Sequence, residues 1–338
     1  MMGTYKALVT GGAGFIGSHL VEGLLAEGHS VAIVDNLDDF YSSAQKRANL
    51  EEVARAGEIR VYETNICDFP ALRAVFEKER PEVVIHMAAR VGVRPSIEQP
   101  KLYQEVNIGG TLNLLMLVRS FEVRKFVFIS SSSVYGVTAH LPFAEDHVEP
   151  KPISPYAATK LAGELLCYTY SHLYRLPVVC LRLFSVYGPR QRPDLAVHKF
   201  TALMEAGKPI PIFGDGSSGR DYTYVDDIVA GVLAGVAYET DYDIFNLGSF
   251  HPVKLLDLVR LLERATGMRA TLNFLSAQAG DVPQTCADIG KARRLLGYEP
   301  RTSIETGLER FWAWHHGARR VMTPGDTPGD PPVSPSRQ

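Results

Sequence analysis

Tyr156 and Lys160 stand four residues apart in a segment that Pro155 is expected to open as a helix. This spacing puts both side chains on one helix face, so the Lys160 ammonium can lie near the Tyr156 phenol. A free phenol has a pKa of about 10, and a neighbouring positive charge favours its phenolate form. Tyr156 would then be a usable general base. Alone the pattern is weak, because a surface lysine beside a half-buried tyrosine has the same spacing.

Four consecutive serines, 130–133, lie at the expected carboxyl end of a strand over residues 125–130. Ligands of open parallel sheets bind at this edge. Ser131 precedes Tyr156 by twenty-five residues, and we expect it to join Tyr156 and Lys160 there. The three side chains together are suited to the reversible oxidation of a carbinol, a reaction that needs a hydride acceptor.

A glycine-rich turn over residues 9–17 supplies a site for such an acceptor, because it ends an expected strand and opens an expected helix. The helix N-terminus offers free N–H groups and the positive end of its dipole to a pyrophosphate, and the missing side chains let the backbone approach. Gly12 can replace Gly11 in the three-glycine pattern. The expected cofactor contacts of this turn are Gly11, Gly14, Phe15, Ile16 and Gly17.

The residue after the second expected strand indicates which dinucleotide binds. Asp35 follows the last glycine by eighteen residues, where a carboxylate accepts hydrogen bonds from the adenosine ribose and repels a 2′-phosphate. This favours NAD over NADP, and Asn36 is placed to share the ribose. Ala88 and Ala89 are small residues where NAD would cross the sheet edge. His86 is included in the expected cofactor site, although a satisfied core histidine is the commoner role for such a residue.

Alternating short apolar runs and longer amphipathic runs predict the elements that carry these residues. Consecutive βαβ units form a parallel sheet with helices on both faces. We therefore predict an α/β fold, a Rossmann-type doubly wound parallel sheet. The expected strands cover residues 5–10, 30–34, 59–62, 83–86, 125–130 and 178–183, and the expected helices cover 14–27, 43–56, 70–79, 101–121 and 155–174.

Beyond residue 183, loops rich in glycine, proline and arginine separate shorter elements, which predicts a smaller C-terminal α/β lobe for the substrate. The expected NAD-binding domain covers residues 1–184 and is rejoined by about 225–248. The lobe then covers residues 185–224 and 249–318. Residues 319–338 are rich in proline and are expected to form a disordered tail.

Composition excludes several classes of protein. The net charge is −3 and the pI is about 6.4, so there is no basic excess for binding nucleic acid. No segment has the pattern of a membrane span or a secretory signal, and we expect a cytoplasmic protein. The four cysteines lack metal-type spacing and are expected to be buried packing residues, with no metal site. His315 and His316 are expected at an exposed helix end.

These features together resemble the extended short-chain dehydrogenases/reductases, and within them the nucleotide-sugar 4-epimerases. The resemblance extends to about Trp314, and it rests on the glycine turn, the serine run, Tyr156 with Lys160, and residues 86–89, 107–111 and 220–226. It implies that Tyr156 takes the proton of the sugar 4-hydroxyl while NAD accepts the hydride from C4. Ser131 would hydrogen-bond the same oxygen, and Lys160 would hold the nicotinamide ribose. The 4-keto sugar would then turn over and regain the hydride on its other face.

Other stretches resemble the branch of that family that acts on UDP-glucuronate. In related dehydratases and decarboxylases an acid follows in the serine strand, whereas this chain has Ser132 and Ser133, which suit a carboxylate. Arg192 is our first choice for organising that carboxylate. Gln278 replaces an arginine found in many UDP-galactose epimerases. The stretches are 35–41 with Lys46 and Arg47, 92–94, 186–194 and 278–282.

The resemblance also implies the remaining contacts. Arg220 would neutralise the diphosphate and Asp281 would reach the uridine-side ribose. Asn65 stands where many relatives have an aspartate near the adenine, and Asp68 is placed to compensate. The full set of expected substrate contacts is Arg94, Ser131, Ser132, Ser133, Tyr156, Ser185, Arg192, Arg220, Gln278 and Asp281. The remaining expected cofactor contacts are Asn65, Ile66, Asp68, Asn107, Tyr156 and Lys160.

The resemblance therefore predicts an NAD-dependent 4-epimerase that interconverts UDP-glucuronate and UDP-galacturonate. A homodimer is expected through the apolar faces of residues 112–118 and 155–174. Three alternatives stay open: a UDP-glucose 4-epimerase, a UDP-glucuronate decarboxylase, and a nucleotide-binding sensor without catalysis. The intact Ser131, Tyr156 and Lys160 argue against the sensor.

Overall fold

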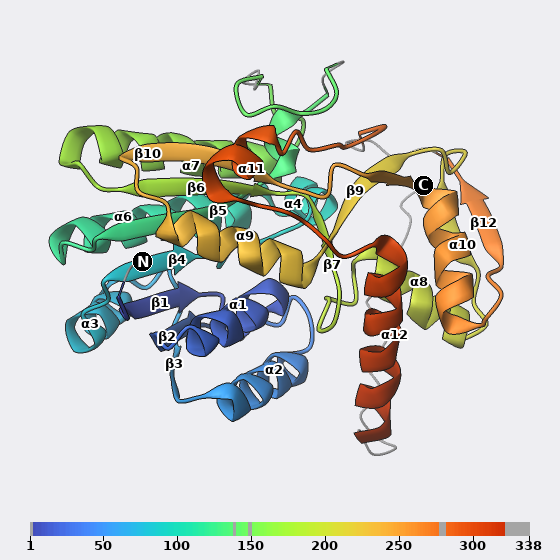
Figure 1. Ribbon diagram of the computed structural model, residues 1–338, viewed down its shortest axis with the longest axis horizontal. Helices are drawn as coiled ribbons and strands as arrows, with labels where there is room; N and C mark the ends of the chain where they lie inside the picture. Colours follow the sequence, from blue (N-terminus) through green and yellow to red (C-terminus); the bar gives the residue numbers. More distant parts are fainter. Residues whose placement is uncertain (1–2, 138–139, 148–150, 277–281, 322–338) are drawn as a thin grey trace.

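The computed structural model describes residues 3–137, 140–147, 151–276 and 282–321. Its centre is a seven-stranded sheet in which every neighbouring pair of strands is parallel (Figure 1). This confirms the predicted Rossmann-type fold. In spatial order the strands are β10 (Tyr242–Leu247), β6 (Val178–Leu183), β5 (Lys125–Ser131), β4 (Val83–His86), β1 (Lys6–Thr10), β2 (Ser30–Asp35) and β3 (Ile59–Glu63).

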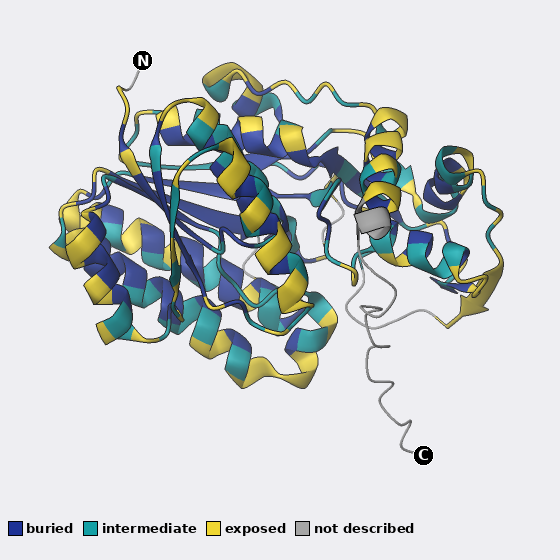
Figure 2. Ribbon diagram, turned by 90° about the horizontal axis from the view of Figure 1, so that it is seen from below, coloured by how far each residue is buried: buried dark blue, intermediate teal, exposed yellow. Residues whose placement is uncertain are grey.

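Helices cover both faces of the sheet, because its strands alternate apolar side chains to the two sides. In β1, Ala7 and Val9 belong to one buried cluster and Leu8 belongs to the other. Figure 2 shows the strands as the most continuous buried layer. The first face carries α1 (Phe15–Ala26), α2 (Ser43–Ala56) and α9 (Val225–Ala237), and the second carries α3 (Phe69–Glu79), α6 (Thr111–Ser120) and α7 (Pro155–Tyr174).

The single helix expected over residues 101–121 is wrong. The structure has α5 (Pro100–Gln104), a π-helical turn over Glu105–Gly110, and then α6. Gly110 packs so closely on Ile66 that an added Cβ would lie 2.5 Å from the Ile66 Cδ1 atom. The wider π-helical turn therefore coincides with a close contact between two residues that are distant in sequence.

Shorter elements lie beside one end of the main sheet. A three-stranded sheet contains β7 (Ser185–Tyr187), β9 (Gly219–Tyr224) and β11 (Pro252–Lys254), and β8 (Ile210–Phe213) pairs with β12 (Leu272–Leu275). The remaining helices are α4 (Val93–Glu98), α8 (Ala196–Glu205), α10 (Leu255–Thr266), α11 (Gly290–Leu296) and α12 (Ile304–Val321). The segment 225–248 holds α9 and β10, and one buried cluster runs from β1 to α12, so the division into domains stays a prediction.

Two expectations about polar and sulfur side chains need correction. His315 is buried at 5% exposure, and its Nε2 lies 2.9 Å from the Glu205 carboxylate, because α12 packs on α8 instead of ending in solvent. Cys67 is only half-buried, whereas the other three cysteines are buried. None of the helices in the described part of the chain is long and apolar enough to span a membrane.

Candidate active site

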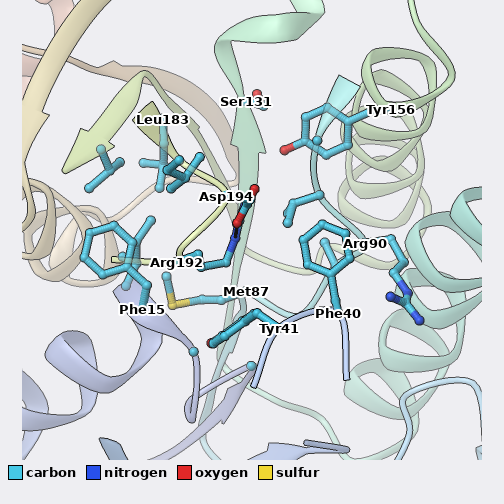
Figure 3. A pocket seen from close by; sticks show the side chains of 18 of the residues that line it. Phe15, Phe40, Tyr41, Met87, Arg90, Ser131, Tyr156, Leu183, Arg192 and Asp194 are labelled. Atoms are coloured by element: carbon cyan, nitrogen blue, oxygen red, sulfur yellow. Dashed lines mark hydrogen bonds and ion pairs between the residues drawn. The ribbon is translucent and has the colours of Figure 1, made fainter. Parts of the chain in front are cut away.

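A cavity of about 700 Å³ lies at the carboxyl edge of the main sheet and extends to the short elements beside it. Its lining joins the glycine turn, the serine run and the start of α7 to the loop after β7 (Figure 3). The cavity therefore collects residues from both halves of the chain at the edge where ligands of such sheets bind.

Ser131, Tyr156 and Lys160 all line this cavity. Ser131 lies close enough to the Tyr156 hydroxyl to lower its pKa, and the Lys160 ammonium donates to the Ile129 carbonyl oxygen at 2.7 Å. Ser154 caps α7 by accepting from the Ala157 N–H at 3.1 Å, so the helix starts where Pro155 predicts. The structure thus brings the expected catalytic residues together on β5 and α7.

The charges around the phenol differ from the sequence-based expectation. Burial raises the pKa of Tyr156, while the hydrogen bond from Ser131 and the positive charge of Arg192 lower it. Burial lowers the pKa of Lys160 to about 8, against the nearby Glu164 carboxylate, which raises it. The cation that favours the phenolate in this structure is therefore Arg192, whereas Lys160 is directed to the backbone of β5.

The glycine turn has the shape that a dinucleotide phosphate needs. Gly11 has a positive φ of 74°, and a Cβ there would lie 2.8 Å from the Ala88 nitrogen. Gly14 is the N-cap of α1, and the first-turn N–H groups of a helix have no acceptor within the helix. Gly12 packs against Ile33 and is outside the cavity lining. The structure therefore fits the reading with Gly11, and Gly11, Gly14, Phe15, Ile16 and Gly17 all line the cavity.

Asp35 lies buried at the end of β2. Its Oδ2 accepts from the Ala13 N–H at 3.1 Å, its Oδ1 accepts from the Leu37 N–H at 2.9 Å, and the Lys46 ammonium lies 3.9 Å away. These bonds orient the carboxylate and leave lone pairs for further donors. Asn36, Asn65, Ile66, Ala88 and Ala89 line the same part of the cavity.

Three expected cofactor residues lie outside the cavity lining. Asp68 accepts from the Ala71 N–H at 3.1 Å and caps α3. The two ring nitrogens of His86 lie 2.8 and 2.9 Å from the hydroxyls of Thr10 and Thr111, so it is a satisfied core histidine. Asn107 donates from Nδ2 to the Arg90 carbonyl and accepts at Oδ1 from the Arg90 N–H, which fixes the chain after β4.

The expected substrate residues Ser132, Ser133, Ser185, Arg94 and Arg220 line the other part of the cavity. The Ser133 hydroxyl donates to the Ser131 hydroxyl at 3.0 Å, which ties the serine turn to the candidate catalytic group. The guanidinium of Arg94 lies 4.7 Å from the Phe213 ring centroid. Gln278 and Asp281 lie outside the described residues.

Arg192 is already engaged by a neighbour. Its Nε and Nη2 donate to the two carboxylate oxygens of Asp194, both at 2.9 Å. Figure 3 shows this pair in the middle of the cavity, between Tyr156 and Tyr41. A substrate carboxylate at Arg192 would therefore have to share the guanidinium with Asp194.

Sequence reasoning missed the roles of Tyr41 and Phe40, although it singled out the stretch that contains them. The Tyr41 hydroxyl is buried and has no hydrogen-bond partner among the described residues. The hydroxyl oxygen lies 3.9 Å from the place that a Cβ would take if Gly14 had a side chain. The Phe40 ring lies 5.9 Å from the guanidinium of Arg90 and 5.6 Å from that of Arg192. The segment with Phe40 and Tyr41 therefore lies between the two parts of the cavity.

In comparisons with known proteins, the family described as GDP-mannose 4,6 dehydratase matches residues 8–311. UDP-glucuronate 4-epimerase of Thermodesulfobacterium geofontis is 46% identical over 314 residues, which are 93% of this chain and 96% of that protein. The crystal structure of UDP-glucuronic acid 4-epimerase from Bacillus cereus with UDP-glucuronic acid and NAD has a TM-score of 0.86 at 38% identity and covers 93% of this chain and 99% of that chain. UDP-glucose 4-epimerase of Thermotoga maritima with UDP-glucose has a TM-score of 0.86 at 34% identity and covers the same shares, 93% and 99%.

Proposed function

This chain belongs to the GDP-mannose 4,6-dehydratase family of extended short-chain dehydrogenases/reductases, and from that premise we propose that it is an NAD-dependent UDP-glucuronate 4-epimerase. The observation that carries the proposal is that Ser131, Tyr156 and Lys160 line one cavity together with the glycine turn. The similar structure from Bacillus cereus was obtained with UDP-glucuronic acid and NAD.

The residues of the first half of the cavity fit NAD. The glycine turn would offer the N–H groups of α1 to the pyrophosphate, Asp35 and Asn36 would accept from the adenosine ribose, and Asn65 and Ile66 would hold the adenine. The buried Tyr41 hydroxyl supports the fit, because an unsatisfied buried donor needs a partner and a phosphate oxygen beside Gly14 would provide it. NAD held there would supply a reversible hydride acceptor for the substrate carbinol carbon.

Tyr156 acts as base and then as acid at the sugar 4-oxygen. As the C4–H bond breaks, the phenolate takes the proton of the 4-hydroxyl and a 4-keto sugar forms. Ser131 donates to the same oxygen and Lys160 holds the nicotinamide ribose. When the sugar has turned over, Tyr156 returns the proton to the oxygen of the inverted centre. The positive charge of Arg192 assists by favouring the phenolate.

The uronate carboxylate is received by hydroxyl donors and by Arg192. Ser132 and Ser133 lie in the cavity where an acid would repel the carboxylate. Arg220 on β9 faces the same cavity and neutralises the diphosphate of the nucleotide. This half of the site therefore favours a UDP-sugar whose sugar ring carries a carboxylate.

The test is a product assay. Incubation with UDP-glucuronate and no added reductant should yield UDP-galacturonate, and release of carbon dioxide at the rate of turnover would instead indicate decarboxylation. A protein with bound NAD that forms no C4 epimer would contradict the proposal.

A second candidate is UDP-glucose 4-epimerase, which the bidentate Asp194–Arg192 pair favours because it neutralises the guanidinium. The ratio of kcat/KM for UDP-glucuronate to that for UDP-glucose separates the two. A ratio below one would favour the neutral sugar.

The enzyme acts as a homodimer through α6 and α7. Leu165, Tyr168 and Leu173 of α7 are 61%, 53% and 60% exposed, and Met116 of α6 is 43% exposed. Such an apolar surface on two neighbouring helices is typical of a subunit interface. Sedimentation should give a dimer, and Leu165→Arg with Leu173→Arg should give a monomer.

The free cysteines fit a cytoplasmic enzyme.

A further inference from the structure

A fully buried ion pair lies directly behind the candidate catalytic residues. Glu164 follows Lys160 by one helical turn on α7, and Arg182 lies on β6. Both side chains are only 3% exposed. Arg182 donates from Nε at 2.9 Å and from Nη2 at 2.8 Å to the two carboxylate oxygens of Glu164. The pair is outside the cavity lining.

This pair bonds both ends of the segment 130–135, which contains the serine run. The Ser130 hydroxyl, next to Ser131, donates to the Glu164 carboxylate at 2.5 Å. At the other end of the segment, Arg182 Nη1 donates to the Tyr135 hydroxyl at 3.0 Å. The short turn 132–135 between these two bonds carries the cavity-lining serines.

The burial of the pair points to positioning rather than to stability. Removing two charges from water costs so much that well-packed apolar residues often stabilise a protein equally well or better. What apolar residues cannot do is orient a serine hydroxyl and a tyrosine hydroxyl at once. Lys160 adds a second link between α7 and β5 by donating to the Ile129 carbonyl at 2.7 Å.

We propose that the Glu164–Arg182 pair is the positioning unit of the reaction: it fixes the serine run so that Ser131 meets Tyr156. The inference rests on the proposed epimerase only for the substrate, because the geometry serves any oxidation that uses Ser131, Tyr156 and Lys160.

Glu164 is the anion that acts on Lys160. Burial lowers the pKa of Lys160 to about 8, and the Glu164 carboxylate opposes this. Three other titratable groups nearby are neutral near pH 7, because burial lowers the pKa of His86 to about 3 and raises the pKa values of Cys167 and Tyr242. The remaining groups nearby are Tyr156 on α7, Cys180 on β6 and the paired Arg182.

Glu164→Gln tests the inference because it removes the charge and keeps the shape. We expect kcat to fall about ten-fold or more with KM for the UDP-sugar within about two-fold, since alignment acts on the chemical step. Without the carboxylate Lys160 loses its proton at lower pH, so the alkaline limb of the rate profile should move down by roughly half a unit or more. A purely structural role would leave that limb in place.

Glu79→Gln is the matched control. The Glu79 side chain is also buried, at 7% exposure, and accepts from Arg60 Nε at 2.8 Å, but it joins α3 to the far edge of the sheet. This variant should keep the wild-type kcat, and the alkaline limb of its pH–rate profile should stay at the wild-type pH. A rate loss and a shifted limb of equal size in both variants would overturn the inference.

A double variant, Glu164→Gln with Arg182→Met, avoids leaving a buried unpaired cation if the single variant fails to fold. It should keep a cooperative thermal transition and still show the loss of kcat and the lowered limb. Wild-type kcat and an unshifted limb in the folded double variant would overturn the inference.

A readout without turnover uses the phenol itself. Ultraviolet titration of each protein minus its Tyr156→Phe derivative gives the pKa of Tyr156, which should rise in Glu164→Gln because Ser131 no longer donates well. An unchanged value would contradict the inference. If wild type epimerises UDP-glucose but not UDP-glucuronate, the proposed function fails while these comparisons still decide the inference.

Discussion

The two halves of the cavity are built in different ways. The half with the glycine turn, Asp35 and Ser131 lies on the ends of strands in one sheet, and the Ala13 N–H, which is distant in sequence, donates to the Asp35 carboxylate. The half with Arg192 lies on a loop, and its partner Asp194 is two residues away. We propose that the rigid half determines the reaction type and that the loop half selects the sugar, since loops change without disturbing the core.

Tyr156→Phe should have the largest effect, because it removes the acid–base group of the rigid half. General acid–base catalysis contributes about 10² to 10⁴-fold, and we expect a loss of about 10³-fold or more in kcat. The check is the epimerisation rate, with NAD affinity measured by calorimetry as the control for folding. A variant within ten-fold of wild type would show that another group moves the proton.

Arg192→Ala should come next and should change substrate choice and pH dependence together. Loss of a charged contact should lower kcat/KM for UDP-glucuronate about 10 to 100-fold, and UDP-glucose should be affected less. Arg192 lowers the pKa of Tyr156, so without it the phenolate forms at higher pH and the acid limb of the rate profile should move up. Arg192→Lys keeps the charge and is the control. Equal losses of kcat/KM for UDP-glucuronate and UDP-glucose would contradict the proposal that the loop half of the cavity selects the sugar.

Tyr41→Phe should weaken NAD binding by about ten-fold, the value of one hydrogen bond to a charged group. The same change should leave the cofactor-free protein as stable or more stable, because the Tyr41 hydroxyl is buried without a partner among the described residues. Calorimetric titration with NAD and a thermal melt of the cofactor-free protein measure the two effects. Unchanged NAD affinity would mean that Tyr41 faces a different group.

Much of the rigid half could be predicted from sequence, because periodicity and capping are local. The strands 83–86 and 178–183 and the helices 43–56 and 155–174 begin and end where expected. The single helix expected over residues 101–121 is wrong, and its interruption involves a contact between distant residues. Gly110, in the π-helical turn, packs against Ile66, and the His86 ring is hydrogen-bonded to Thr111; neither contact has a local signal.

In the loop half, the sequence predicts a charged residue but does not predict the partner of that charge. The sequence singled out Arg192 as a carboxylate partner, but nothing in its spacing shows that both donor groups already bind Asp194 in the folded chain. For Tyr41, the sequence indicates that the stretch 35–41 matters but gives this residue no role. Only the folded chain shows that its hydroxyl is buried next to the glycine turn.

Asp194→Asn should have the smallest effect and should sharpen the comparison most. It keeps the side-chain shape but removes the negative charge beside Arg192, so UDP-glucuronate should bind a few-fold more tightly, corresponding to about 0.5–1 kcal/mol for a partly exposed pair. UDP-glucose has no carboxylate and its KM should stay unchanged. The KM values of the two sugars check this directly. Tighter binding of both sugars would mean that Asp194 shapes the cavity rather than competing for Arg192, and weaker binding of UDP-glucuronate would mean that Asp194 orients the guanidinium for the substrate.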